Sequence, residues 1–93
     1  MILHHIQTSP GQDRALDCAL KYAAVEDSFM FSGNGVNALL IQKWKSRLND
    51  KTVFLLKTDV QARGLEKLLA AYTQIEHNQF VEQTLIHKKV ITW

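Results

Sequence analysis

The sequence of 93 residues is poor in the residues that cross-link a chain or make it flexible: it has one cysteine, one proline and four glycines. A single cysteine, Cys18, cannot form an internal disulfide, which excludes a small secreted scaffold held together by cross-links. The scarcity of glycine and proline leaves little material for a flexible linker. Since no internal repeat is present either, we expect residues 1–93 to form one domain.

Long hydrophobic runs and a strong charge of one sign are also missing. The longest aliphatic and aromatic run, 53–56, is far shorter than the ~20 apolar residues that cross a bilayer. Residues 1–7 have neither the basic leader nor the apolar core of a signal peptide. Eleven basic and nine acidic side chains give a net charge of only +2, which argues against a dedicated nucleic-acid module. These features predict a cytoplasmic protein without membrane contact.

Short apolar segments alternate with segments of helical periodicity, within a composition typical of globular proteins. The expected strands are 2–7, 28–32, 52–57, 74–76 and 90–93. The expected helices are 10–24, 36–48, a short one that Gly64 ends, and a last one that follows Asn78. This alternation predicts a single three-layer α/β domain with a mostly parallel sheet of about five strands flanked by helices.

The expected helix starts rest on residues that accept hydrogen bonds from free backbone N–H groups. Ser9 can cap the first helix, with Pro10 at its first position and Gln12 completing a capping box. Asp59 and Asn78 are predicted to cap the short helix and the last helix in the same way.

The segment 36–48 is expected to be one continuous helix. Its apolar positions recur at helical spacing and predict a buried stripe: Val36, Leu39, Leu40 and Trp44. The cations beside Trp44 are Lys43, Lys45 and Arg47. They suit a helix C-terminus, while a mixture of cations and an aromatic also occurs in segments that contact RNA. The first interpretation is favoured because Trp44 fits the buried stripe.

Functional groups of a parallel sheet gather in the loops after the carboxyl ends of its strands. Gly33-Asn34-Gly35 lacks the third glycine of a dinucleotide-binding fingerprint, so a tight turn is expected there and no cofactor. The loop 57–64 has no nucleophile with a neighbouring base. Asp59 and Arg63, four residues apart in this loop, are expected to form a local ion pair.

The four histidines do not have the spacing of a metal site. His4 and His5 are neighbours on a strand and point to opposite faces, and His77 and His87 lack nearby companion ligands. We therefore expect no metal, and histidines that are either exposed or satisfied by hydrogen bonds.

Cys18 is predicted to lie on the outer side of the first helix, away from its apolar stripe. Arg14 and Lys21 are close enough along the helix to approach its sulfur and favour the thiolate. Asp17 and the position in mid-helix oppose this effect. The alternative is an inert thiol, exposed or in an interface.

Several segments, taken together and in order, resemble the TusB/DsrH family. These segments are Leu3–Pro10, Glu26–Ser28, Asn34–Ala38, Asp59–Gly64, Phe80-Val81 and Trp93. The resemblance extends over essentially the whole chain. It implies a small cytoplasmic subunit of a sulfur relay that assembles with TusC/DsrF-like and TusD/DsrE-like subunits into a heterohexamer.

The resemblance also implies that, in such complexes, persulfide sulfur passes from a TusA-like donor toward a TusE/DsrC-like acceptor. In the Tus branch the sulfur ends in 2-thiouridine at the tRNA wobble position, whereas the Dsr branch serves oxidative sulfur metabolism. The cysteine that accepts sulfur belongs to the TusD/DsrE-like subunit, near the end of the third strand. Here the matching stretch, Leu55–Gly64, has no cysteine, which implies an accessory and non-catalytic subunit.

Two other functions stay open at this point. Some DsrH-type proteins carry a cysteine in the first helix, so Cys18 is a candidate for holding sulfur, and with turnover the chain would be a true sulfurtransferase. A self-associating structural domain unrelated to sulfur is the other possibility. Trp93 is expected either to pack over a sheet edge or to anchor an interface, for which Asp59 and Arg63 are further candidates.

Overall fold

The computed structural model describes residues 1–93, whose five strands form one parallel sheet of order β4-β3-β2-β1-β5. The strands are β1 (Ile2–Ile6), β2 (Ser28–Phe31), β3 (Thr52–Leu56), β4 (Thr73–Ile75) and β5 (Lys89–Thr92). Every neighbouring pair is parallel. The predicted strands and the parallel sheet are therefore confirmed, and the last strand lies at an edge as expected.

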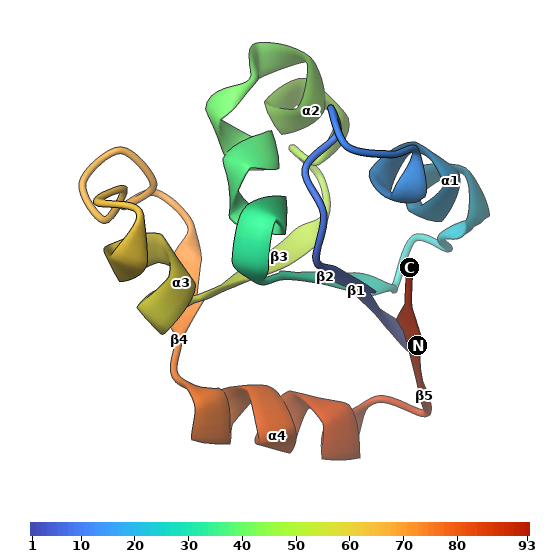
Figure 1. The fold of residues 1–93 in the computed structure, drawn as a ribbon. Coiled ribbons are helices and arrows are strands. Elements are labelled where there is room, and N and C mark those ends of the chain that lie inside the picture. The colour runs from blue at the N-terminus through green and yellow to red at the C-terminus, as the bar shows by residue number, and fades with distance from the viewer.

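Helices cover both faces of this sheet unequally (Figure 1). They are α1 (Ala15–Tyr22), the 3₁₀ helix η1 (Gly33–Leu40), α2 (Gln42–Arg47), α3 (Lys57–Ala62) and α4 (His77–Ile86). All except α4 lie on one face, and α4 alone crosses the other. This arrangement confirms the three-layer prediction. No helix has the length and apolar character needed to cross a bilayer.

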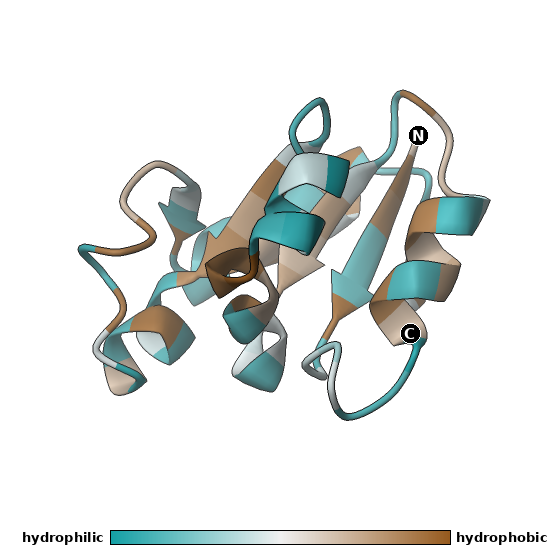
Figure 2. Cartoon of the chain, turned by 90° about the horizontal axis from the view of Figure 1, so that it is seen from above, coloured by the Kyte–Doolittle hydropathy of each residue, from teal (hydrophilic) through white to brown (hydrophobic).

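The main core lies between the sheet and the layer of four helices. Phe29 and Phe31 of β2 stack at 6.4 Å between ring centroids and are fully buried, together with Ile6 of β1 and Leu55 of β3. A smaller cluster of Leu3, Met30 and Ile75 lies on the other face, against which Phe80 of α4 packs. Strand β2 is buried on both faces, which explains the apolar run Phe29-Met30-Phe31 within it. Figure 2 shows that the covering helices carry both apolar and polar residues.

The first helix begins later than predicted. Gln12 does contact Ser9, because the Ser9 N–H donates to Oε1 of Gln12 at 2.9 Å. This turn does not continue, since Oδ1 of Asp13 accepts both the Ala15 N–H at 3.0 Å and the Thr8 hydroxyl at 2.8 Å. The local bonds of Asp13 compete with the helical pattern, and α1 starts only at Ala15.

The predicted helix 36–48 is in fact two helices. Ile41 is extended, with φ −107° and ψ 122°, and separates η1 from α2. In η1, which has three residues per turn, Val36 and Leu39 share the buried face, whereas Leu40 is rotated away and is 46% exposed. Trp44 of α2 returns to the core as expected. Including Leu40 in the buried stripe was wrong because the segment has the tighter period.

Two of the predicted helix caps were also wrong. The residue before α3 is Leu56, and Asp59 lies in the first turn of that helix, where its carboxylate binds another loop. Helix α4 is capped by Glu76, two residues before the predicted cap Asn78, and Glu76 forms a capping box with Gln79. Gly64, with φ +66°, follows α3 as predicted.

Candidate functional site

The carboxyl ends of β1 and β2 are joined so closely that only glycine fits between them. The Ser32 N–H donates to the Ile6 carbonyl at 3.0 Å, which brings the next loop against the end of β1. Gly33 has φ +54°, a conformation that side chains rarely tolerate. A Cβ on Gly35 would overlap the Ile6 carbonyl oxygen. The two glycines therefore serve a tight turn, as the sequence predicted.

Asp59 and Arg63 of the β3–α3 region hold this glycine loop from the side. Oδ2 of Asp59 accepts the Gly33 N–H at 2.7 Å. Arg63 donates to the Asn34 side-chain oxygen at 2.7 Å and to the Asp59 backbone carbonyl at 3.1 Å. The predicted ion pair between the two side chains is absent, because each side chain binds the neighbouring loop. Their role as partner contacts stays a prediction.

A cleft of about 190 Å³ opens at the carboxyl ends of β3 and β4, and we call it the carboxyl-edge cleft. Its lining consists of Lys57, Thr58, Gln61, Glu76 and His77. These side chains supply an ammonium group, an imidazole, a hydroxyl and an amide, and Glu76 is engaged as the cap of α4. None of them is a thiol, so the cleft can hold a polar or anionic group but cannot bond to sulfur.

His5 lies nearby, at the end of β1. Its Nε2 and the Ser32 hydroxyl are 2.7 Å apart, and its ring packs edge-on against Phe80 of α4. Burial lowers the pKa of His5, so the neutral imidazole is favoured. The histidine is thus satisfied within the fold, as expected, and ties the carboxyl edge to α4.

Cys18 is exposed on α1, at the end of the sheet opposite α3 (Figure 1). Arg14 and Lys21, the cations predicted to approach its sulfur, both bind the neighbouring Asp17 at 3.2 Å. Arg47 binds the same carboxylate at 2.8 Å, and the hydrogen bonds from Arg47, Lys21 and Arg14 hold the pKa of Asp17 far below its usual value. Hence the strongest ionic cluster on α1 belongs to Asp17.

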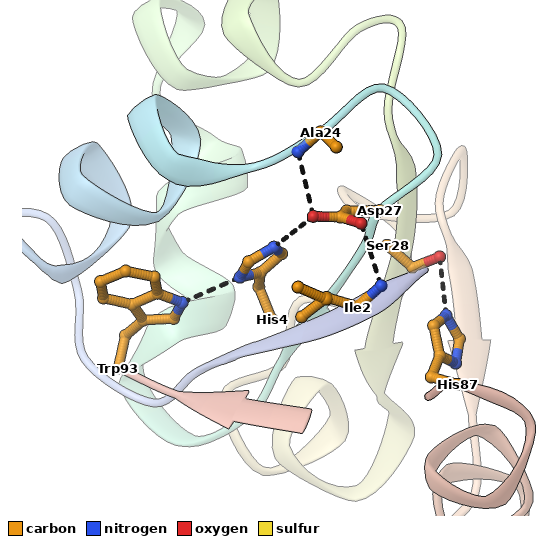
Figure 3. Close-up of polar contacts among 7 residues, drawn as sticks. All are labelled: Ile2, His4, Ala24, Asp27, Ser28, His87 and Trp93. Atoms are coloured by element: carbon orange, nitrogen blue, oxygen red, sulfur yellow. Dashed lines mark hydrogen bonds and ion pairs between the residues drawn. The ribbon is translucent and has the colours of Figure 1, made fainter. Parts of the chain in front are cut away.

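A buried chain of hydrogen bonds joins Trp93 to His4 and Asp27 (Figure 3). The indole N–H donates to Nδ1 of His4 at 3.0 Å, and Nε2 of His4 lies 2.9 Å from Oδ2 of Asp27. Because an indole can only donate, Nδ1 carries no proton and Nε2 donates to the carboxylate. The neutral Nε2–H form of His4 is therefore fixed by its two neighbours. Tyr22 packs edge-on against both rings.

Asp27 also holds the start of the sheet (Figure 3). It accepts the Ile2 N–H at 2.9 Å and the Ala24 N–H at 3.0 Å, and its side chain is only 2% exposed. Burial raises the pKa of Asp27, but the hydrogen bonds from His4, Ala24 and Ile2 together lower it by more. The pKa of Asp27 therefore lies below its usual value. The carboxylate is therefore the ionised centre of a structural cluster.

The other two histidines also have clear places. His87 lies between the Gln83 carbonyl, 2.7 Å from Nδ1, and the Ser28 hydroxyl, 3.1 Å from Nε2. The carbonyl accepts from Nδ1, so Nε2 is free to accept from Ser28. His77 is exposed at the start of α4. No three metal-binding side chains come together.

Sequence reasoning did not single out Asp27 as a key residue. The available signal was its position, an acidic residue directly before a buried strand that follows a strand with two adjacent histidines. Trp93 packs against the main core, as one of its two predicted roles requires. Its alternative role as an interface anchor stays a prediction.

Comparison with known proteins decides the family. The family model described as DsrH like protein matches residues 8–90, a span that includes Cys18 and the whole carboxyl-edge cleft. The chain belongs to the DsrH-like family. This membership confirms the resemblance found in the sequence and implies a role in sulfur relay with DsrE- and DsrF-like partners.

A solved structure shows the same fold as this DsrH-like chain. A conserved protein of unknown function from Bacteroides thetaiotaomicron matches 99% of this chain and 94% of its own with a TM-score of 0.75. The sequence identity is 11%, so this likeness concerns the fold alone. No curated protein matches the sequence.

Proposed function

We propose that this DsrH-like chain is an accessory, non-catalytic subunit of a cytoplasmic sulfur-relay complex. In this complex it assembles with DsrE- and DsrF-like subunits and helps to pass persulfide sulfur toward 2-thiolation of the tRNA wobble uridine. The observation that carries the proposal is the carboxyl-edge cleft beyond β3, whose lining contains no cysteine. The family resemblance puts the sulfur-accepting cysteine of the catalytic paralogue in this region.

Sulfur transfer of this kind needs two thiols. The acceptor thiolate attacks the outer sulfur of the donor persulfide, the donor S–S bond breaks, and the donor leaves as a thiolate while the acceptor becomes the persulfide. The carboxyl-edge cleft supplies no thiol. Cys18 lies on α1, at the side of the sheet opposite α3 (Figure 1). A partner must therefore provide the reactive sulfur, and this chain contributes docking surface.

Helix α4 is the surface best suited to a partner subunit. It lies alone on its face of the sheet, and none of its residues is fully buried (Figure 1). Leu85 is 80% exposed and Ile86 66%, and Val81 one turn before Leu85 is also exposed. Exposed apolar side chains gathered on one helix are typical of protein interfaces. The family relation supports a homologous DsrE- or DsrF-like subunit as the occupant.

Co-expression with DsrE- and DsrF-like subunits tests this proposal. The wild-type chain is expected to co-purify with both, and light scattering is expected to give the mass of a heterohexamer. Leu85→Lys would place an ammonium group in the interface and is expected to weaken assembly at least about tenfold. Leu68→Lys is the matched control, because Leu68 is 72% exposed but lies outside α4.

Equal assembly of both lysine variants would show that α4 is not the docking face. A chain that forms a defined oligomer by itself and binds neither paralogue would contradict the sulfur-relay proposal and support a self-associating structural domain.

One observation favours a second function: the only thiol, Cys18, is exposed to solvent and free. A persulfide on Cys18 would serve a DsrH-type subunit in oxidative sulfur metabolism. For an accessory subunit, we expect the assembled complex to deliver sulfur at the same rate with Cys18→Ser as with the wild type. Intact mass measurement after incubation with a persulfide donor provides the direct readout.

A stable adduct of one sulfur atom on the wild-type chain, absent in Cys18→Ser, would support the second function. Repeated sulfur delivery by the isolated chain would contradict the accessory role altogether.

A further inference from the structure

The largest cavity of the molecule lies away from the carboxyl-edge cleft. This groove has a volume of about 480 Å³ and runs between the end of α2, the start of β3 and residues 71–73. Because β3 and β4 are parallel, their starts line the groove and their ends lead to the cleft. The groove is thus a separate feature at the opposite ends of the same two strands, and its size suits a small ligand.

Its charged lining is entirely positive. Lys45 and Lys51 line the groove, and no aspartate or glutamate does. The side chain of Lys51 is only 18% exposed, although its ammonium has a single ion pair, 3.9 Å from an oxygen of Asp50. The Asp50 side chain is 80% exposed, so this contact is weak in water. Two ammonium groups that line one groove with so little compensation from carboxylates attract an anion.

The remaining lining combines neutral donors with an apolar wall. Asn49, Thr52 and Thr73 provide an amide and hydroxyl groups, and the half-buried Tyr72 provides a phenol. Burial raises the pKa of Tyr72, so its hydroxyl keeps its proton and can donate at neutral pH. Apolar contact comes from Leu48, Val53, Phe54 and Ala71, together with the ring of Tyr72.

We propose that this groove binds a small organic phosphate, with the phosphate between Lys45 and Lys51 and a planar or apolar body against Tyr72 and Val53. Two ammonium groups and several neutral donors match a dianion with three free oxygens. A cation is excluded by the charge of the lining. Extended single-stranded RNA is disfavoured, because the nearby Trp44 is buried and Lys43 and Arg47 cover its ring at 5.0 Å.

Titration calorimetry with phenyl phosphate tests this proposal on the whole chain. Phenyl phosphate is expected to bind with a Kd of about 1 mM or tighter, more weakly as salt is added. Inorganic phosphate, which lacks the ring, and benzyl alcohol, which lacks the charge, are each expected to bind several-fold more weakly. Lys51→Gln is expected to weaken the binding of phenyl phosphate about tenfold. Lys89→Gln is the control: it removes the same charge from β5, three strands away from β3.

NMR chemical shifts provide an independent readout that uses only the wild-type chain. The amide signals of residues 48–54 and 71–73 are expected to move on addition of phenyl phosphate, and those of β5 are expected to stay in place. Three results would overturn the proposal: no binding by the wild type, equal losses in Lys51→Gln and Lys89→Gln, or shifts confined to other surfaces. The groove does not depend on the sulfur-relay function, so either proposal can fail alone.

Discussion

Replacing Asp27 with alanine is expected to lower the free energy of unfolding by about 3–5 kcal/mol. The change leaves three donors without their acceptor: Nε2–H of His4 and the N–H groups of Ile2 and Ala24. Asp27 is 2% exposed at its side chain, so water cannot easily replace the lost bonds. Urea denaturation followed by tryptophan fluorescence at neutral pH measures the loss.

The matched control is Asp50→Ala, since the Asp50 side chain is 80% exposed and has one contact at 3.9 Å. Its free energy of unfolding is expected to stay within about 0.5 kcal/mol of the wild type. Similar, small losses in both variants would show that the cluster around Asp27 contributes little to stability.

The same carboxylate is expected to make the fold sensitive to acid. The pKa of Asp27 in the folded chain lies below its ordinary value of 3.8. Its stabilising contribution is therefore fully present above pH 3.8 and is lost as the pH falls through the lower, folded value. Asp27→Asn, which carries no charge at any pH, is expected to lack this part of the acid dependence. If the free energy of unfolding of Asp27→Asn fell with pH below about 4 as steeply as that of the wild type, Asp27 would not be the source of the acid sensitivity.

Gly35→Ala is expected to cost about 3 kcal/mol, the second large effect. The new Cβ would overlap the carbonyl oxygen of Ile6, and that atom belongs to the backbone at the end of β1. Since the Ile6 carbonyl also accepts the Ser32 N–H, relief requires a shift of the strand or the loop. Such a shift would also disturb the bond between Gly33 and Asp59 at the sheet edge.

Gly11→Ala provides the control, because nothing lies within 4 Å of a Cβ at that position and its φ is not positive. This variant is expected to be neutral or slightly stabilising, since alanine restricts the unfolded chain. Thermal unfolding of both variants by circular dichroism gives the comparison. A Gly35→Ala protein as stable as Gly11→Ala would mean that the sheet edge is less rigid than the structure implies.

The order of strands and helices could be predicted because it depends on patterns that are local in sequence. The unbroken apolar run of β2 and the helical stripe around Leu16 and Ala19 leave little choice of structure. The helix boundaries were harder, because they depend on competing side-chain bonds. The hydrogen bonds of Asp13 interrupt the helical pattern, so that α1 begins only after it. The tight period of η1 turns Leu40 outward. Neither effect shows in hydrophobic periodicity.

The candidate site was only partly predictable, because its contacts join residues far apart in the sequence. Asp59 was expected to cap its own helix, but its carboxylate binds the N–H of Gly33, 26 residues earlier. Asp27 binds His4 across 23 residues, and Trp93 binds the same ring across 89. What the sequence did show correctly was a lack: residues 55–64 contain no thiol, whatever their neighbours in space.

The position of β1 between β2 and β5 has a consequence for folding during synthesis. The ribosome releases β1 before the other strands, yet the partner of its outer edge, β5, is made only after β2, β3 and β4. Throughout that interval the nascent sheet displays an unpaired strand edge, which is a template for pairing with other chains. Closure of the sheet, and the locking of His4 by Trp93 that accompanies it, must therefore wait until residues 89–93 have left the ribosome.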